Sequence, residues 1–231
     1  MSFEFLENSL KSVEAVIFDL DGTLYDFKGL PRRLVLNAPF QMFKIRAERE
    51  ARKSLKGRDL KNKAEWQQKF FELIAQFAKI PFEKAKNWYK DFYCPYMVKI
   101  LRKYYSVRPE ALEIFKNLKK ANIKIVVFSD YPLVKERLNA IGVNTEDLEY
   151  LVSAEDFGAL KPTPRPFLEI AEYLKIRPEN VLVVGDRMDT DGKGAKDAKM
   201  QFLHTESHKT PANDSVVSWK DFLEIVKRVI A

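Results

Sequence analysis

Two carboxylates stand two residues apart near the start of the chain, Asp19 and Asp21, and Gly22 follows them. The apolar run before them, VIF, is rich in β-branched and aromatic residues and is typical of a buried strand. Residues i and i+2 of an extended chain share a face, so these carboxylates would repel unless a cation or a proton lies between them. The pair suits a divalent metal site on oxygen ligands or a nucleophile beside an acid/base. A lone Asp-x-Asp would more simply be a strand and its turn, so the interpretation depends on the rest of the chain.

Three later segments carry side chains that complement this pair. Ser129 follows an apolar run, Lys161 stands before a proline, and Asp186 opens an acidic loop that continues through Asp189 and Asp191. A hydroxyl and an ammonium group are what phosphate binding needs, one as donor and one as counter-charge. Carboxylate oxygens are the ligands that Mg²⁺ prefers. Each segment is a weak signal alone, but together they predict a site for phosphate chemistry.

The elements that must position these residues alternate along the chain. Strands are expected at residues 15–20, 123–128, 150–153, 180–184 and 200–204. Helices are expected at residues 109–120, 133–141, 164–174, 191–199 and 220–230. This alternation predicts an α/β fold with a doubly wound, mainly parallel sheet. The carboxyl ends of parallel strands share one edge, where ligands bind in such sheets. That edge would therefore collect Asp19, Asp21, Ser129, Lys161 and Asp186.

Residues 27–105 break the alternation. Apolar residues at three- and four-residue spacings predict helices over 38–55 and 64–78, and Pro81 opens a third helical region that Pro95 interrupts. We expect an all-helical insertion at 27–105, with its aromatic residues forming a small core of its own. The α/β core then consists of residues 1–26 and 106–231.

Composition excludes several classes of protein. Residues 1–10 lack the basic region of a secretory signal, and charges break every apolar run before the roughly 18–20 residues of a membrane span. A single cysteine, Cys94, excludes an internal disulfide framework and fits a reducing compartment. These features predict a cytoplasmic protein without a membrane partner. Oligomeric state leaves no signal in the sequence.

The formal charge of +7 is concentrated in one stretch. Residues 28–63 contain twelve basic and three acidic side chains, a net +9. Such a stretch could attract nucleic acid or an anionic small molecule. Charge pattern alone favours a solvated helix face, so nucleic acid is not the expected partner.

The four segments, in this order, resemble the motifs of the haloacid dehalogenase (HAD)-like hydrolase superfamily. DLDGT at 19–23 matches its first motif, D-x-D-x-T, and VVFS at 126–129 resembles the second. KPTPRPF at 161–167 resembles the third, and GDRMDTD at 185–191 resembles the fourth, G-D-x-x-x-x-D. The helical insertion after the first motif resembles the first-type cap of this superfamily. Asp21 favours the phosphatase branch, because the dehalogenases generally lack an Asp there.

The resemblance implies a Rossmann-like core and a Mg²⁺-dependent phosphatase acting on a small phosphorylated metabolite through an aspartyl-phosphate. Asp19 would be the nucleophile and Asp21 the general acid/base, while Ser129 and Lys161 would hold the phosphoryl oxygens. Asp19, the backbone carbonyl of Asp21 and Asp186 would hold the metal. Asp191, or less favourably Asp189, would orient waters or Lys161 from outside the ligand set.

Two alternatives remain open at this point. The same site could transfer phosphate within a sugar, as a phosphomutase does, and the sequence does not separate the two. A non-catalytic binding module on the same fold would have lost a motif residue, and none is lost. One departure from the superfamily pattern, Tyr131 directly after the second motif, either lines the substrate pocket or packs.

Overall fold

A five-stranded parallel sheet forms the centre of the molecule. The computed structural model describes residues 3–213 and 215–230. The strands follow the spatial order β3-β2-β1-β4-β5, and every neighbouring pair is parallel. Their bounds are β1 Ala15–Phe18, β2 Lys124–Ser129, β3 Tyr150–Ser153, β4 Val181–Gly185 and β5 Gln201–His204. This confirms the predicted α/β class with a doubly wound parallel sheet.

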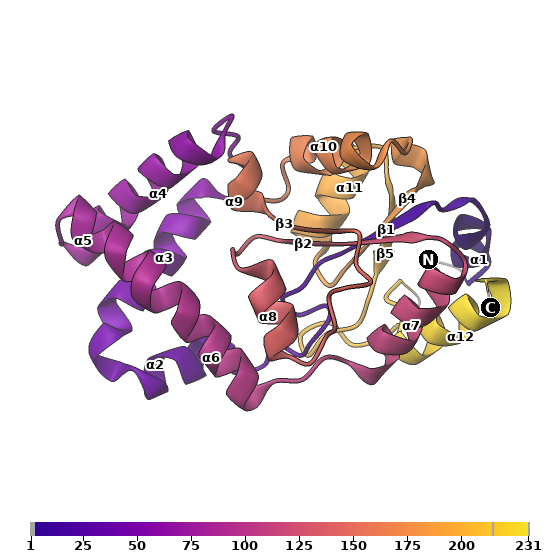
Figure 1. Ribbon diagram of the computed structural model, residues 1–231, viewed down its shortest axis with the longest axis horizontal. Coiled ribbons are helices and arrows are strands. Elements are labelled where there is room, and N and C mark those ends of the chain that lie inside the picture. Colours follow the sequence, from indigo (N-terminus) through magenta and orange to yellow (C-terminus); the bar gives the residue numbers. More distant parts are fainter. Residues whose placement is uncertain (1–2, 214, 231) are drawn as a thin grey trace.

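Helices cover both faces of the sheet, which explains the continuous apolar runs of its strands. All residues of β1 and β4 are buried, as expected for a parallel sheet enclosed on both sides. Helices α7 (Pro109–Lys120) and α12 (Trp219–Ile230) pack together on one face, and α12 also contacts α1 (Phe3–Ser12). Helices α10 (Pro164–Leu174) and α11 (Lys193–Asp197) lie on the opposite side (Figure 1). Helix α8 (Val134–Ala140) contacts β2 and β3.

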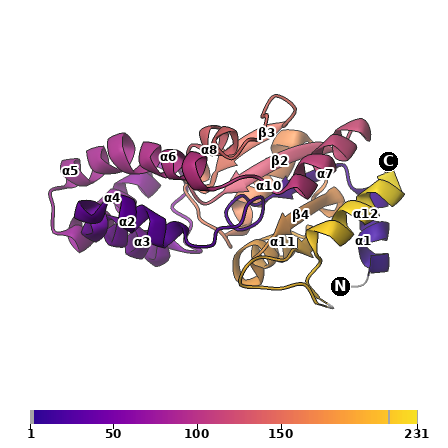
Figure 2. The ribbon, with the colours of Figure 1, turned by 90° about the horizontal axis from the view of Figure 1, so that it is seen from below.

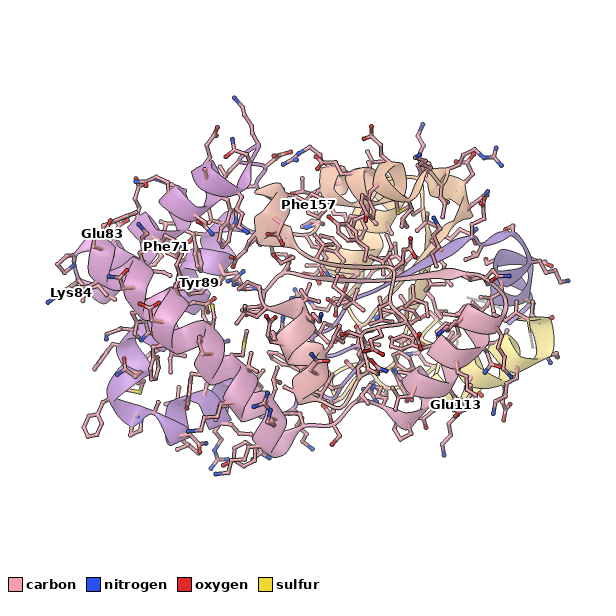
Figure 3. All side chains as sticks on the ribbon, in the orientation of Figure 1. Phe71, Glu83, Lys84, Tyr89, Glu113 and Phe157 are labelled. Atoms are coloured by element: carbon pink, nitrogen blue, oxygen red, sulfur yellow. The ribbon has the colours of Figure 1, made fainter. Side chains whose placement is uncertain are left out.

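Residues 30–104, here called the helical segment, lie to one side of the sheet. This segment contains α2 Leu30–Asn37, α3 Met42–Leu55, α4 Lys63–Ala78, α5 Phe82–Asn87 and α6 Cys94–Tyr104. Figure 2 shows it at the end of the molecule opposite the two chain ends. Its aromatic side chains pack on one another: the Trp66 and Phe70 rings stack with centroids 4.4 Å apart, and the Phe71 and Tyr89 rings lie 5.6 Å apart (Figure 3).

The helical segment differs from the sequence prediction at two points. Helix α2 was not expected, because only eight residues carry it and Pro31 stands in its first turn. Pro95 does not interrupt the third helical region. A π-helical turn, η2 (Trp88–Tyr93), runs directly into α6, where Pro95 occupies the first turn. Because a π-helical turn directly precedes Pro95, the missing N–H of the proline does not end the helical region.

Among the described residues, no helix is both long and apolar enough to cross a membrane. Cys94 is buried on α6, and burial raises the pKa of its thiol to about 12. The thiol is therefore a packed side chain rather than a reactive one.

Candidate active site

The predicted site residues meet at the carboxyl edge of the sheet, around the central strand β1. Phe18, the last residue of β1, pairs with Val127 of β2 on one side and Val184 of β4 on the other. The chain order reverses between β1 and β4, which makes this crevice the switch point where ligands bind in open α/β sheets. Asp19 follows β1 directly, and Asp186 follows β4 directly.

Lys161 joins the first motif to the fourth. Its Nζ donates to Asp19 Oδ1 at 2.6 Å, to Asp191 Oδ1 at 2.8 Å and to the backbone oxygen of Phe128 at 3.1 Å. Only 2% of Lys161 is exposed. Burial acts to lower its pKa, but the carboxylates of Asp19 and Asp191 raise it above the usual range, so the side chain stays an ammonium.

The carboxylates of Asp19, Asp186 and Asp191 form one cluster. One oxygen from each lies within 4.8 Å of the others, an arrangement that could hold a metal ion. Burial, together with the neighbouring carboxylates and against the opposing Lys161 charge, raises the pKa of Asp19 to about 7. Burial and the charge of Asp19 raise the pKa of Asp186 to about 6, and burial also raises that of Asp191. One ammonium group does not compensate two buried carboxylates and the half-buried Asp186, so the cluster is short of positive charge.

Two small residues allow the cluster to form. Gly22 has φ +103°, and a Cβ there would lie 2.7 Å from Asp186 Oδ2. The glycine therefore supplies both the left-handed backbone and the space for Asp186. Thr23 ties the first motif to the fourth, since its hydroxyl donates to Asp19 Oδ2 at 2.9 Å and accepts from the Asp186 backbone N–H at 3.1 Å.

Asp21 lies in a second group of contacts, which includes Ser129. The Ser129 hydroxyl donates to Asp21 Oδ2 at 2.8 Å, and the Tyr25 hydroxyl donates to Asp21 Oδ1 at 2.5 Å. Arg137 pairs with the same carboxylate, and its Nη1 also donates to Ser129 Oγ at 2.9 Å. Burial acts to raise the pKa of Asp21, but the Arg137 charge and these hydrogen bonds outweigh it and leave the pKa below its usual range.

Arg137 and Tyr25 are site residues that the sequence analysis missed. Arg137 is completely buried on α8. A signal was present, because Arg137 stands three residues after Val134 and four before Ile141, on the apolar stripe of the helix. A cation in such a stripe is rarely buried without a carboxylate partner. Tyr25 stands two residues after the first motif, and no role was predicted for it.

A third group, around Arg52, links the helical segment to the sheet edge. Arg52 on α3 pairs with Glu48 at 2.8 Å and with Glu155 at 3.1 Å, and it donates to the backbone oxygen of Asp130 at 2.5 Å. Its guanidinium carbon lies 4.1 Å from the centroid of the Tyr131 ring. Glu155 belongs to α9 (Ala154–Phe157), a one-turn helix absent from the sequence prediction. The ion pair across these elements is almost fully buried.

The basic stretch at 28–63 therefore serves in part as a contact with the α/β core. Besides Arg52, Lys56 pairs with Asp189, and Lys63 pairs with Asp156 at 2.7 Å. The last two pairs are exposed. Solvated helix faces account for part of the stretch, as charge pattern alone favoured, and contacts with the core account for another part.

A cavity of about 670 Å³ opens beside the carboxylate cluster. The α/β core contributes Asp19, Lys161, Asp186 and Tyr131 to its lining, and the helical segment contributes side chains from α2, α3, η2 and α6. Tyr131, which was expected either to line the substrate pocket or to pack, lines this cavity and also packs under Arg52. His204 lies near, with its Nε2 3.0 Å from the backbone oxygen of Asp186.

Comparison with known proteins identifies the family. The family model described as haloacid dehalogenase-like hydrolase matches residues 13–199. The chain belongs to this family. The recognition made from the four motifs is confirmed, and with it the prediction of a hydrolytic enzyme.

Named relatives support the phosphatase branch. A glyceraldehyde 3-phosphate phosphatase from Methanopyrus kandleri is 27% identical over 216 residues, which cover 89% of this chain and 91% of the relative. A phosphonoacetaldehyde hydrolase from Bordetella pertussis is 24% identical over 92% of this chain and 78% of the relative.

Solved structures support the fold. A 2-haloacid dehalogenase from Pseudomonas syringae superposes with a TM-score of 0.61 at 21% identity, over 94% of this chain and 99% of that one. A structure described as a predicted phosphoglycolate phosphatase from Haemophilus somnus superposes with a TM-score of 0.62 at 19% identity, over 94% and 98% of the two chains.

Proposed function

We propose that this HAD-like hydrolase is a Mg²⁺-dependent phosphatase that hydrolyses a small phosphorylated metabolite through an aspartyl-phosphate on Asp19. One observation carries the proposal: Asp19 is held by Lys161 at 2.6 Å, inside a largely buried carboxylate cluster that opens into a cavity. This arrangement pairs a carboxylate nucleophile with a cation and with ligands for a metal. The phosphatase names of several relatives support the same reaction.

The donor set fits Mg²⁺. The three clustered carboxylates offer hard oxygen ligands, and Asp186 Oδ1 is buried without a hydrogen-bond partner among the described residues. We propose that Asp19, Asp186 and the backbone carbonyl of Asp21 hold the ion, while Asp191 orients Lys161 at 2.8 Å. The bound ion would neutralise the cluster and allow an anionic phosphate to approach Asp19.

The chain's own residues supply the remaining steps. Asp19 attacks phosphorus, the P–O bond to the leaving alcohol breaks, and Lys161 balances charge on the phosphoryl oxygens. Water then attacks the phosphorus of the aspartyl-phosphate, which releases phosphate and restores the Asp19 carboxylate. Asp21 is the group for the proton transfers, giving a proton to the leaving oxygen and later taking one from water.

Ser129 and Asp21 must exchange partners before this chemistry begins. The Ser129 hydroxyl has one proton, and it donates that proton to Asp21. To bind a phosphoryl oxygen, Ser129 must release Asp21. To protonate a leaving group, Asp21 must also move away from Arg137, because the ion pair favours its charged form. We propose that phosphate binding drives both changes.

We propose that residues 27–105 are a cap over this site and that 1–26 and 106–231 form the catalytic core. The cap assignment is supported by the cavity, whose lining comes from both the helical segment and the sheet edge. A cytoplasmic location remains part of the proposal, on the sequence arguments given above.

Hydrolysis of p-nitrophenyl phosphate, with Mg²⁺ and with EDTA, tests the proposed function. We expect the wild type to release phosphate only with the metal and Asp19→Asn to be inactive, because the amide is not a nucleophile. The control is Asp91→Asn, an exposed acid on η2 outside the cavity lining. Activity that survives Asp19→Asn would refute the nucleophile. Failure of the wild type on every phosphate ester tried would refute the phosphatase.

A further inference from the structure

The cavity extends well beyond the groups that the reaction needs. Asp19, Lys161 and Asp186 occupy only part of its lining, and its volume of about 670 Å³ lies in the range of sites that enclose drug-sized ligands. A phosphate ester of a two- or three-carbon alcohol would leave most of this space to water. The chemistry of the remaining walls therefore indicates which kind of alcohol group the cavity accepts in a phosphate ester.

Those walls are mainly apolar on the side of the helical segment. Leu30 and Leu34 on α2 and Met97 on α6 line the cavity, with Phe27 from the connection before α2. From the α/β core, Tyr131 adds a half-buried ring, fixed by Arg52 at 4.1 Å. Apolar side chains make no hydrogen bonds to the hydroxyl groups of a sugar or triose, which would lose hydration there without compensation. A flat ring loses little hydration and gains contact area with aromatic and aliphatic walls.

Polar donors stand beside these apolar walls. Arg49 on α3 lines the cavity, is exposed, and forms no ion pair with any described residue. Lys209 and Thr210 line it from the loop after β5. A guanidinium and an ammonium group donate hydrogen bonds and accept none, so they match ring nitrogens or carbonyl oxygens. The cavity thus combines a mainly apolar wall from the helical segment with polar and charged groups from the sheet edge and the loop after β5.

We propose that the substrate is the phosphate monoester of an alcohol that carries a heteroaromatic ring, and that Leu30, Leu34 and Met97 hold this ring while Arg49 binds its acceptor atoms. The inference rests on the proposed phosphatase function and narrows it. It separates this chain from the relatives named for glyceraldehyde 3-phosphate, a substrate without a ring.

Specificity constants for two groups of esters test the inference. Flavin mononucleotide, pyridoxal phosphate and adenosine monophosphate carry heteroaromatic rings; glyceraldehyde 3-phosphate and phosphoglycolate do not. Phosphate release is measured with Mg²⁺ for each compound. We expect kcat/KM for the best ring-bearing ester to exceed that of both small esters by about tenfold or more, which is the discrimination that added apolar contact provides.

A pair of leucine substitutions on α2 tests the assigned wall. Leu34→Phe places a larger side chain at the cavity, whereas Leu36→Phe makes the same change at a residue that is 63% exposed and outside the lining. We expect Leu34→Phe to lower kcat/KM for the ring-bearing ester by about tenfold and for glyceraldehyde 3-phosphate by less than about twofold. We expect Leu36→Phe to change neither.

The outcomes separate this inference from the phosphatase proposal. Preference for glyceraldehyde 3-phosphate or phosphoglycolate over every ring-bearing ester would overturn the inference and leave the phosphatase standing. An equal loss on both groups of esters in Leu34→Phe would also overturn it, because the wall would then not contact the ring. Absence of phosphate release from all five esters would overturn the phosphatase and the inference together.

Discussion

Asp19→Asn should make the metal-free protein more stable. Only 8% of Asp19 is exposed. Burial raises the pKa of its carboxyl group to about 7, and Asp191 and Asp21 add to this effect against the opposing charge of Lys161. At pH 8 the folded protein therefore holds a carboxylate that is better solvated in the unfolded chain. Asparagine has nearly the same shape and carries no charge.

The magnitude follows from the two pKa values of Asp19. Its pKa is about 3.8 in the unfolded chain and about 7 in the folded protein. Between these two pH values the folded state binds more protons, so stability falls as the pH rises. At about 1.4 kcal/mol for each pKa unit, the ionised carboxylate destabilises the fold at pH 8 by about 4 kcal/mol. We expect Asp19→Asn to recover at least half of this in EDTA. At pH 5 the folded wild type carries the proton, so the gain should shrink by half or more.

Denaturant unfolding in EDTA at pH 8 and pH 5 measures this difference. Wild type, Asp19→Asn and the exposed control Asp91→Asn are compared at both pH values. The control should follow the wild type, since Asp91 is exposed and lies outside the carboxylate cluster. Equal or lower stability of Asp19→Asn at pH 8 would contradict the reasoning, and so would a gain of the same size at pH 5.

Three further predictions concern the surroundings of the cluster. Arg137→Met should lower the free energy of unfolding by about 3–5 kcal/mol, because it leaves the largely buried Asp21 carboxylate without its cation. Lys56→Ala, which breaks an exposed pair, should change it by less than about 1 kcal/mol, and similar losses for both variants in denaturant unfolding would argue against this ranking. Titration calorimetry should show Mg²⁺ affinity falling from pH 8 to pH 6, because protons compete at carboxylates whose pKa values are about 7 and about 6; a constant affinity would show that these groups are not ligands. Gly22→Ala and Gly142→Ala both strain a backbone with positive φ, but only the first places a Cβ against Asp186, so only the first should weaken Mg²⁺ binding.

The order and type of the main elements of the α/β core could be predicted from the sequence because local pattern determines them. Apolar β-branched runs mark β1, β2 and β4, and these strands are enclosed on both faces. Short helices such as α2 and α9 could not be predicted, because contacts far along the chain stabilise them more than their own residues do. The prediction that Pro95 interrupts the third helical region was wrong for a related reason. The π-helical turn before Pro95 depends on packing, which a sequence pattern does not show.

At the site, the residues that the motifs name could be predicted, and their partners could not. Asp19, Lys161, Asp186 and Asp191 meet as expected from the edge that they share. The hydrogen bond from Ser129 to Asp21 was not predicted. Arg137, which contacts both residues, lies in a helix outside the four motifs, so no motif indicated this group of contacts. Their roles in catalysis stay predictions until the substitutions above are measured.

The crossing points of the helical segment have a consequence for protein engineering. Close to the points where the chain leaves the core and returns to it, the backbone N–H of Arg108 donates to the Leu24 oxygen at 2.9 Å. Entry and exit are thus adjacent, which is the geometry that tolerates exchange of an inserted module. A segment transplanted into this core would, however, have to carry a cation in the place of Arg52. Without that cation, Glu155 would lose its partner in a buried ion pair. An exchange in this chain would therefore have to replace the helical segment together with the positive charge that Arg52 supplies.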